Sequence, residues 1–482
     1  MHSTIEGVSG IEYRMAERTQ TALHDIRIGA RLRQAEEEYL KRHSTGLSGR
    51  EICQRIRTQF DVPLSPSTYS LIRTDQRAPT LAQVIALART LEVTVEYLLG
   101  DLMTVHRAGI RWTQRLSGLN AQQHRWLRAL DVLTSGDPLS ADVCESLDIP
   151  APNFAEPHSV EETEREIGRL AQSAVFMGVA ELDATADAID TELSERVRAH
   201  LTTDTKLPDS LRGRLQVTVV RNPVHPSYPN GGHLGPVITG NLGIWLLTRF
   251  LEENTHAGQL GLAGGFHVAS LVRQIGTTRW SWPERSYRLY PLSVEPFFKQ
   301  ISLADALVGE LTHRLGALLG PHSIHGYSLR AFGYLSDEGD VILRHRSITT
   351  VLDQLREIDA AVFGVGDSLT PDGPLQRVLA TQGFPIQSPE AAMADVCLNP
   401  INKDGERLPI RPGATSDTRR LSQLISVDTE QLRRMAQLER QKLVLLLASG
   451  PKKAPSTRAI VRGGFVNHIL CDDRLARDLL DD

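Results

Sequence analysis

Hydrophobic positions along the chain follow two patterns, and the change between them lies in the proline-bearing stretch 137–158. Before this stretch, apolar residues recur every three or four positions, the spacing that places them on one face of a helix. After it, short continuous apolar runs such as Leu215–Val220 and Leu443–Ala448 alternate with helical windows. Runs of this length predict buried strands, and their alternation with helices predicts a mostly parallel sheet. We therefore predict an α + α/β protein, with an all-α N-terminal part and a larger α/β part.

The N-terminal part contains five predicted helices. In the second of them, Ile52, Ile56 and Phe60 are four residues apart and share one face. The third begins with Ser65 as a helix cap and Pro66 at the first helical position, where a missing N–H is tolerated. The predicted helices are Ala22–His43, Ser48–Phe60, Ser65–Thr74, Leu81–Leu91 and Val93–Leu99.

The third helix has the composition of a DNA-reading helix. Its first turn carries small polar residues, which can approach the phosphates and base edges of a major groove. Arg73 and Arg77 flank its end, where they can contact backbone phosphates. A positioning helix followed by such a reading helix is typical of helix-turn-helix proteins. The residues expected at the DNA are Ser65, Ser67, Thr68, Tyr69, Arg73 and Arg77.

The segment Leu47–Asp101 resembles the XRE/Cro-type, phage-repressor-like helix-turn-helix. The resemblance rests on the short polar helix, on the loop Gln76–Pro79 and on the stretch Ala88–Leu99. It implies a DNA-binding head at residues 22–101, preceded by a flexible N-terminus at residues 1–21. The loop before the reading helix, TQFDVPLS, is longer than the loop usual in the family. A small helical bundle used only for dimerisation is the alternative for this segment.

The charge of the chain limits how it can bind DNA. With 53 basic and 58 acidic side chains, its net charge of −5 argues against nucleic-acid binding along the whole surface but permits one local basic face. Residues 1–101 contain equal numbers of acidic and basic side chains. A helical linker is predicted at residues 102–160, and DNA phosphates or a solvated helix face explain its basic run equally well. That run consists of Arg107, Arg111, Arg115, Arg125 and Arg128.

The cysteines and the apolar stretches indicate the compartment. Cys53, Cys144, Cys397 and Cys471 are far apart and form no CxxC pair. This spacing disfavours a disulfide framework or a zinc site and favours a reducing environment. The apolar stretches are too short to span a bilayer, and the N-terminus lacks the apolar core of a signal peptide. The histidines lack metal-ligand spacing. We expect a soluble cytoplasmic protein without a membrane segment, metal or cofactor.

Three glycine-containing turns follow predicted strands in the C-terminal part. They lie within Leu260–Ser270, Val362–Ser368 and Val444–Ile460. Open α/β sheets bind ligands at the turns that follow the carboxyl ends of their strands. In the third turn, Lys452 and Lys453 enter a helix, and a lysine beside helix N–H groups favours an anion. The three turns together predict a ligand site.

From Glu161 to the C-terminus, these segments resemble the effector-binding domain of SorC-family (DeoR-like, sugar-binding) transcription regulators. That domain is Rossmann-like and similar to the fold of glucosamine-phosphate and ribose-phosphate isomerases. The clearest stretch is Leu443–Leu480, and Cys397–Leu408 matches a family hairpin with Asp404 and Gly405 at its turn. The resemblance implies an effector-binding and oligomerisation domain at residues 161–482. The ligand-binding residues predicted from the turns and the resemblance are Gly264, Gly265, Phe266, His267, Gly364, Gly366, Asp367, Gly450 and Lys453.

The first of the three turns departs from the family pattern. The family's phosphate-binding turn carries threonine hydroxyls, whereas this chain has Phe266 and His267 after the two glycines. Where some members have an arginine after the next strand, this chain has Ser293. A sugar phosphate is therefore one expectation for the effector. A different ligand in the same pocket, or a domain that serves mainly for assembly, are the others.

These features together predict a transcription regulator without catalytic activity. Its expected partners are a double-stranded DNA operator, a small-molecule effector and further copies of itself in a dimer or tetramer. One alternative is a sugar-phosphate isomerase or deaminase fused to a DNA-binding head. Asp367 and Asp372 suggest the deaminase motif, but Pro374 stands where those enzymes need a histidine. The other alternative is a DNA-organising protein that ignores small molecules.

Overall fold

The chain forms two compact units in a computed structural model. The first unit is Met1–Asp183 with Pro223–Gly231, and the second is Ala184–Asn222 with Gly232–Asp482. The predicted start of the effector domain at residue 161 lies inside a helix of the first unit. The structure describes residues 28–43, 46–77, 79–93, 98, 102–107, 110–115, 119–135, 138–176, 180–184, 188–225, 227–228, 234–275, 282–294, 303–329, 345–367, 392–408, 426–439 and 441–481.

The head of the first unit is a bundle of short helices. Capping explains where two of them begin: the Ser48 side chain and Glu51 cap α3 reciprocally, and Thr80 and Gln83 do the same for α5. Apolar residues from these helices form one buried core. The expected flexible N-terminus, residues 1–21, and most of the fifth expected helix lie outside the described residues. The helices are α2 (Gly29–His43), α3 (Gly49–Phe60), α4 (Pro66–Arg73) and α5 (Leu81–Thr90).

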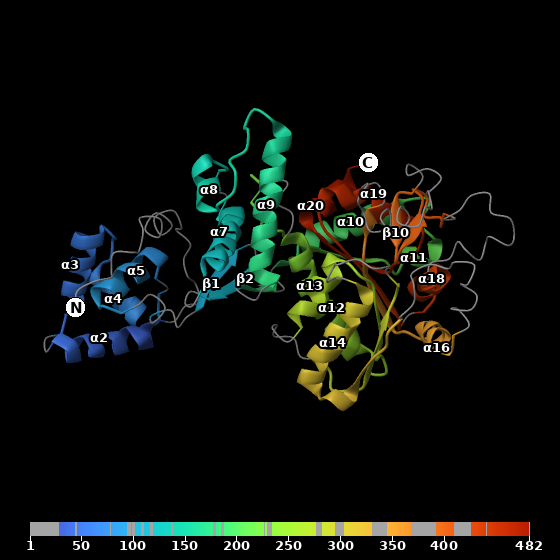
Figure 1. Ribbon diagram of the computed structural model, residues 1–482, viewed down its shortest axis with the longest axis horizontal. Coiled ribbons are helices and arrows are strands. Elements are labelled where there is room, and N and C mark those ends of the chain that lie inside the picture. Colours follow the sequence, from blue (N-terminus) through green and yellow to red (C-terminus); the bar gives the residue numbers. More distant parts are fainter. Residues whose placement is uncertain are drawn as a thin grey trace. The chain divides into compact units, whose positions relative to one another are not determined.

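The expectation of an all-helical N-terminal part is wrong at residues 102–115. Strands β1 (Leu102–Arg107) and β2 (Ile110–Arg115) form an antiparallel pair, so three of the arginines placed on a helix lie on strands. β3 (Ala180–Ala184) completes a three-stranded sheet in the order β1-β2-β3. The reason is visible in the sequence: two runs rich in β-branched and aromatic residues are separated by two residues including a glycine, a hairpin signal. The unit's other helices are α7 (Ala121–Ser135), α8 (Ala141–Ser146) and α9 (Pro157–Phe176), with α7 packed on α9 (Figure 1).

The second unit is built on a seven-stranded sheet in the order β4-β13-β12-β8-β5-β6-β7. Every neighbouring pair is parallel, which confirms the predicted parallel α/β fold. The two apolar runs cited above coincide with β4 and β12, and all six residues of β12 are buried. The strands are β4 (Gln216–Val220), β5 (Gln259–Leu262), β6 (Tyr287–Pro291), β7 (Ile324–Gly326), β8 (Ala360–Gly364), β12 (Leu443–Ala448) and β13 (His468–Asp472).

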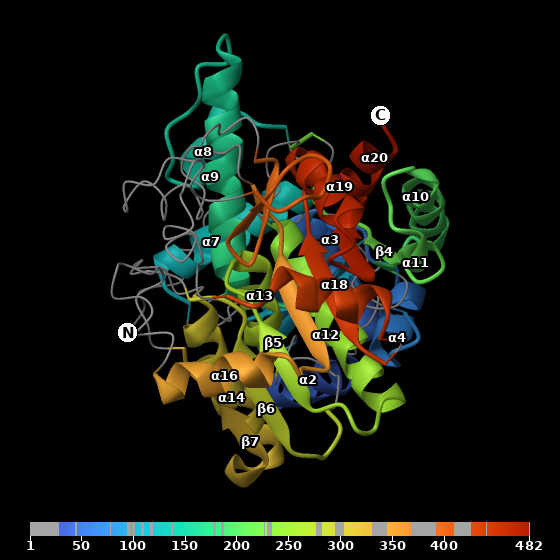
Figure 2. The same cartoon turned by 90° about the vertical axis from the view of Figure 1, so that its right-hand side faces the viewer.

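Helices cover both faces of this sheet (Figures 1 and 2). On one face, α12, α13 and α14 lie side by side, and Leu447 of β12 contacts α12 at Gly243. On the other face, alternate strand residues such as Val444 and Leu446 join one core with α10, α16, α18, α19 and α20. The helices of this unit are α10 (Thr191–Thr203), α11 (Asp209–Arg212), α12 (Gly235–Glu253), α13 (Phe266–Gln274), α14 (Ala304–Leu319), α16 (Arg346–Leu355), α18 (Thr429–Gln437), α19 (Ala454–Arg462) and α20 (Asp473–Leu480), with single 3₁₀ turns η3 (Pro321–Ser323) and η5 (Pro451–Lys453).

A small antiparallel sheet follows the carboxyl end of β8. It consists of β9 (Gly366–Asp367), β10 (Ala394–Val396) and β11 (Asn399–Ile401) in the order β11-β10-β9. Asp404 and Gly405 lie in a tight turn closed by the Asn402 N–H, which donates to the Glu406 carbonyl at 2.9 Å. The hairpin turn expected at these two residues is therefore present.

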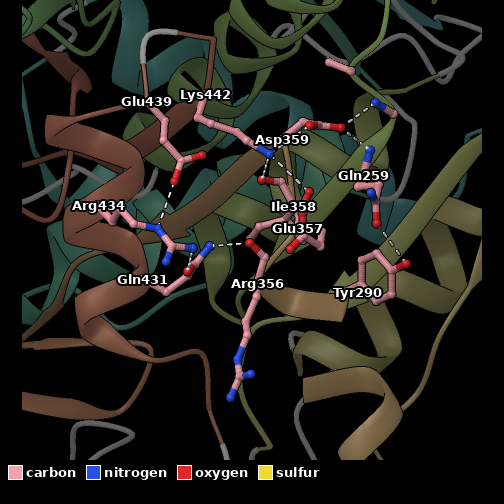
Figure 3. Close-up of polar contacts among 12 residues, drawn as sticks. Gln259, Tyr290, Arg356, Glu357, Ile358, Asp359, Gln431, Arg434, Glu439 and Lys442 are labelled. Carbon is pink, nitrogen blue, oxygen red and sulfur yellow. Dashed lines mark hydrogen bonds and ion pairs between the residues drawn. The ribbon is translucent and has the colours of Figure 1, made fainter. Parts of the chain in front are cut away.

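An ion pair joins the amino ends of three central strands (Figure 3). The Lys442 ammonium, just before β12, donates to the Glu357 carbonyl at 3.1 Å, the Ile358 carbonyl at 2.8 Å and Asp359 Oδ1 at 3.0 Å. The other oxygen of Asp359, just before β8, accepts the N–H of Gly258 at 2.8 Å and of Gln259 at 2.9 Å. Because these residues lie at the amino ends of β5, β8 and β12, the ion pair holds the starts of the three strands together.

Candidate functional site

The three glycine-containing turns meet at one edge of the large sheet. They follow β5, β8 and β12, which are neighbours in the order β12-β8-β5. Because the strands are parallel, their carboxyl ends lie at the same edge, where open α/β sheets bind ligands. The topology thus brings together turns that are about a hundred residues apart in sequence.

His267 connects these turns. Its Nε2 lies 2.9 Å from the hydroxyl of Ser449, which follows β12. A Cβ built on Gly364, at the end of β8, would lie 3.7 Å from His267 Nδ1. Burial, and then the nearby positive charge of Lys453, lower the pKa of His267 to about 3. The imidazole is therefore neutral at physiological pH and serves as a hydrogen-bonding group rather than a cation.

Asp472 fixes the turn that contains Gly450. Its Oδ1 accepts the N–H of Gly450 at 2.9 Å and of Leu475 at 3.0 Å, and its Oδ2 accepts the Asn222 amide at 2.8 Å. Burial raises the pKa of this carboxyl group. Gly450 has a φ of 84°, in the left-handed region that favours glycine. Since the Gly450 N–H points to Asp472 and the Lys453 N–H donates to the Gly450 carbonyl, these two amides are already used.

The start of α13 differs from the turn after β12. No side chain caps this helix, whose N-cap is Gly265 with a φ of 110°. The first N–H groups of a helix have no partner within the helix. Phe266 stands at the first position with 57% of its surface exposed. Of the predicted ligand residues, this segment offers the backbone donors best placed for an anion.

The remaining predicted ligand residues lie where β8 continues into the small sheet. Gly366 and Asp367 form β9, and the backbone of Asp367 pairs with Ala394; its side chain lies outside the described part of the chain. A Cβ on Gly366 would lie 1.5 Å from a carboxylate oxygen of Asp395, so any larger residue there would have to displace that side chain. Ser293 is buried and forms a β-bridge with Ser426.

Sequence reasoning missed four residues at this edge. Ser449 bonds to His267, and Asp472 and Asn222 hold the Gly450 turn. A Cβ on Gly235, the first residue of α12, would lie 2.6 Å from the Ser449 side chain, so α12 begins against this turn. The polar pair Asp472-Asp473 directly after an apolar run was the one available signal.

In the head, the predicted DNA-contacting residues divide into three groups. The first group caps α4: the Ser65 hydroxyl accepts the Thr68 N–H at 3.1 Å and lies 2.9 Å from the hydroxyls of Ser67 and Thr68. These three side chains therefore stabilise the helix start. Arg77 forms a group of its own, because it is exposed just beyond the helix.

The third group, Tyr69 and Arg73, packs toward α2. Tyr69 is 4% exposed and its hydroxyl bonds to the Glu36 carboxylate, an environment that raises the pKa of the phenol through burial and this bond. Arg73 Nε donates to both oxygens of Glu36, at 3.1 and 2.9 Å. Tyr69 is thus a core residue, which corrects its expected exposure at the DNA.

The outward face of α4 carries residues that the sequence analysis did not select. Ser67, Ser70, Leu71 and Thr74 are exposed and follow the i, i+3, i+4, i+7 spacing of one helix face. Of these, only Ser67 was expected to contact DNA. The apolar residues Tyr69 and Ile72 were the available signal. Because they face the core, the opposite face of the helix must point to solvent.

The described residues contain no cluster of three or more His, Cys, Asp or Glu able to hold a metal ion. Among the described helices, none combines the length and the apolar character that crossing a bilayer requires. The four cysteines are buried and form no disulfide with one another.

The chain is similar to several solved structures at low sequence identity. A search of curated proteins found no match. The solved structures that it resembles include the "Probable sor Operon Regulator from Shigella flexneri", at 15% identity and a TM-score of 0.45, covering 61% of this chain and 100% of that one. Another is a DeoR family transcriptional regulator from Listeria monocytogenes, at 14% identity and a TM-score of 0.44, covering 60% and 98%. A third is the full-length sorbitol operon regulator SorC from Klebsiella pneumoniae, at 15% identity and a TM-score of 0.41, covering 75% and 100%.

One family model matches the C-terminal region. It is described as "Putative sugar-binding domain" and covers residues 327–481. The match includes β8, β12, β13 and the Gly450 turn, and so contains two of the three turns at the candidate site. It confirms the sugar-binding part of the resemblance stated from the sequence. Residues 327–481 of this chain are similar to this sugar-binding domain family.

Proposed function

We propose that this protein is a transcription regulator whose affinity for a DNA operator changes when a sugar or sugar phosphate binds its C-terminal domain. The observation that carries the proposal is the meeting of the β5, β8 and β12 turns at one sheet edge, within and beside the matched sugar-binding region. The head of helices α3 and α4 supplies the DNA-binding function, because a capped, polar, outward-facing helix follows a positioning helix.

The groups at the edge suit a ligand rich in hydroxyls. Ser449 and neutral His267 offer hydrogen bonds without a charge, as a sugar hydroxyl requires. A phosphate would take its hydrogen bonds from the uncapped start of α13, where the helix dipole favours negative charge. The positive charge would come from Lys453, which lies close enough to lower the pKa of His267.

Binding to DNA would depend on assembly of the chain. Because residues 1–101 contain equal numbers of acidic and basic side chains, a single head has little electrostatic attraction to DNA. A dimer or tetramer held by the C-terminal domain would present paired heads at a fixed spacing, so that two half-sites bind together. A ligand that prefers one arrangement of the subunits shifts the population toward it and changes operator affinity.

The ligand part of the proposal is tested by thermal unfolding with a panel of sugars and sugar phosphates. A ligand at 100 times its Kd stabilises the folded state by about 2.7 kcal/mol. Lys453→Ala should lose the stabilisation by sugar phosphates, whereas Lys452→Ala, its exposed neighbour in the same turn, should retain it. If no member of the panel stabilises the unaltered protein, the effector proposal is wrong.

The DNA part is tested by mapping the genomic sites that the protein occupies and measuring its affinity for them. Fluorescence anisotropy with a labelled site gives Kd with and without the ligand found above. We expect the ligand to change Kd for the site but not for an unrelated duplex. An unchanged Kd would separate sugar binding from DNA binding and refute the coupling.

A further inference from the structure

The exposed face of α4 has an unusual composition for a surface that reads bases. Its residues Ser67, Ser70, Leu71 and Thr74 include no charged side chain and no amide. Leu71 lies in the middle of this face with 38% of its surface exposed. The inward residues Tyr69 and Ile72 belong to the core of the head, so the direction in which Leu71 points is fixed by packing.

The hydroxyls at the two ends of this face make bonds within the helix. Ser67 Oγ lies 2.9 Å from Ser65 Oγ in the N-terminal cap. Thr74 Oγ1 donates to the carbonyls of Ser70 at 2.9 Å and Leu71 at 3.3 Å. The central part of the face consists of Ser70, with one small hydroxyl, and Leu71, which is the largest side chain of the face and apolar.

The bases offer one apolar partner for such a side chain. Bidentate hydrogen bonds to guanine need arginine or lysine and those to adenine need asparagine or glutamine, and the outward face of α4 has none of these. The C5 methyl group of thymine is the apolar group that a base pair presents in the major groove. We propose that Leu71 contacts thymine methyl groups and that α4 thereby selects A·T pairs in the centre of each half-site. This inference rests on the proposed DNA-binding function of the head.

The test replaces thymine by deoxyuridine, which lacks only the methyl group. Each thymine of a mapped site is replaced in turn, and Kd is measured by anisotropy at one fixed salt concentration with the full-length protein. At one or two positions in each half-site, we expect the substitution to weaken binding about fourfold, the effect of losing one buried methyl group. Leu71→Ala should bind the thymine and deoxyuridine sites equally well at those positions.

Leu40→Ala is the matched control, because Leu40 is a similarly exposed leucine of the same head, 48% exposed on α2. It should keep the full sensitivity to the methyl group. The inference is overturned if the unaltered protein binds its site but ignores every methyl group, or if Leu71→Ala stays as sensitive as the unaltered protein. A change in oligomeric state of Leu71→Ala in sedimentation would instead assign Leu71 to a protein interface and also overturn it. Failure of the unaltered protein to bind any DNA would refute the proposed function itself.

Discussion

Lys442→Met should destabilise the second unit through the loss of one ion pair. In the folded protein the ammonium donates to the Glu357 and Ile358 carbonyls and to Asp359, and the two charged side chains are only 18% and 19% exposed. Removing one partner of a well-buried pair costs about 3–5 kcal/mol, because the other charge is left without compensation. Here Asp359 keeps the N–H groups of Gly258 and Gln259, so we expect a loss of about 2–3 kcal/mol in the free energy of unfolding.

Urea unfolding monitored by circular dichroism measures this loss, with Lys206→Met as the control. Lys206 pairs with Asp404, but these side chains are 49% and 37% exposed, and exposed pairs contribute little. The Lys442 pair lies at the amino ends of the strands, opposite the candidate site, so ligand affinity should be unchanged. If Lys442→Met costs no more than Lys206→Met, the pair does not fix the strands and the reasoning from burial is refuted.

Three further predictions concern the site and the head. His267, with a folded-state pKa lowered to about 3 from 6.5, contributes stability above pH 6.5 that is lost as the pH falls toward 3. His267→Gln should therefore lose less stability than the unaltered protein between pH 6.5 and 4, which urea unfolding at each pH would show. Gly366→Ala should cost at least about 1–3 kcal/mol because its Cβ would overlap the Asp395 carboxylate, whereas Gly213→Ala, with open space around it, should be nearly neutral in thermal unfolding. Ser65→Ala should destabilise the head by about 1 kcal/mol through loss of the α4 cap, seen as faster amide hydrogen exchange in α4; unchanged exchange would contradict the capping role.

The large sheet was predictable because its strands carry their own signal. A run such as Leu443–Ala448, six apolar residues bounded by polar ones, reads as a fully buried strand, and it is β12. The glycine turns after such strands could be placed at the ligand edge, because parallel strands share one carboxyl edge. The strand order could not be derived, since it depends on pairing between segments far apart. Without the strand order, the contact between His267 and Ser449 could not be predicted from the sequence.

The two errors in the N-terminal part have a common cause. β1 and β2 have six residues each, and over so short a run the apolar pattern of a strand, with a period of two, resembles that of a helix, with a period of 3.6. Because the segments around them are helical, a helix was predicted here as well. Tyr69 was expected at the DNA because the polar composition of its helix suggested exposure. The spacing of the apolar residues Tyr69 and Ile72, which places both on the buried face, was not used. The partner of Tyr69, Glu36, lies 33 residues earlier on another helix, and only the folded head shows that the two meet.

The β5 turn of this chain lacks the threonine hydroxyls of the family pattern. We therefore expect the positive charge for an anion to come from another turn of the same sheet edge. Without threonine hydroxyls and with a neutral His267, this turn offers an anion backbone N–H groups at the start of α13 but no positive charge. The β12 turn offers the opposite: Asp472 uses the Gly450 N–H, and the turn contributes the charge of Lys453. For the proposed anion, hydrogen bonds and positive charge would thus come from the turns after two different strands, β5 and β12, with β8 between them. Because Asp472 accepts the Gly450 N–H and so holds the turn that carries Lys453, we expect this buried carboxylate to position Lys453 and not to contact a ligand.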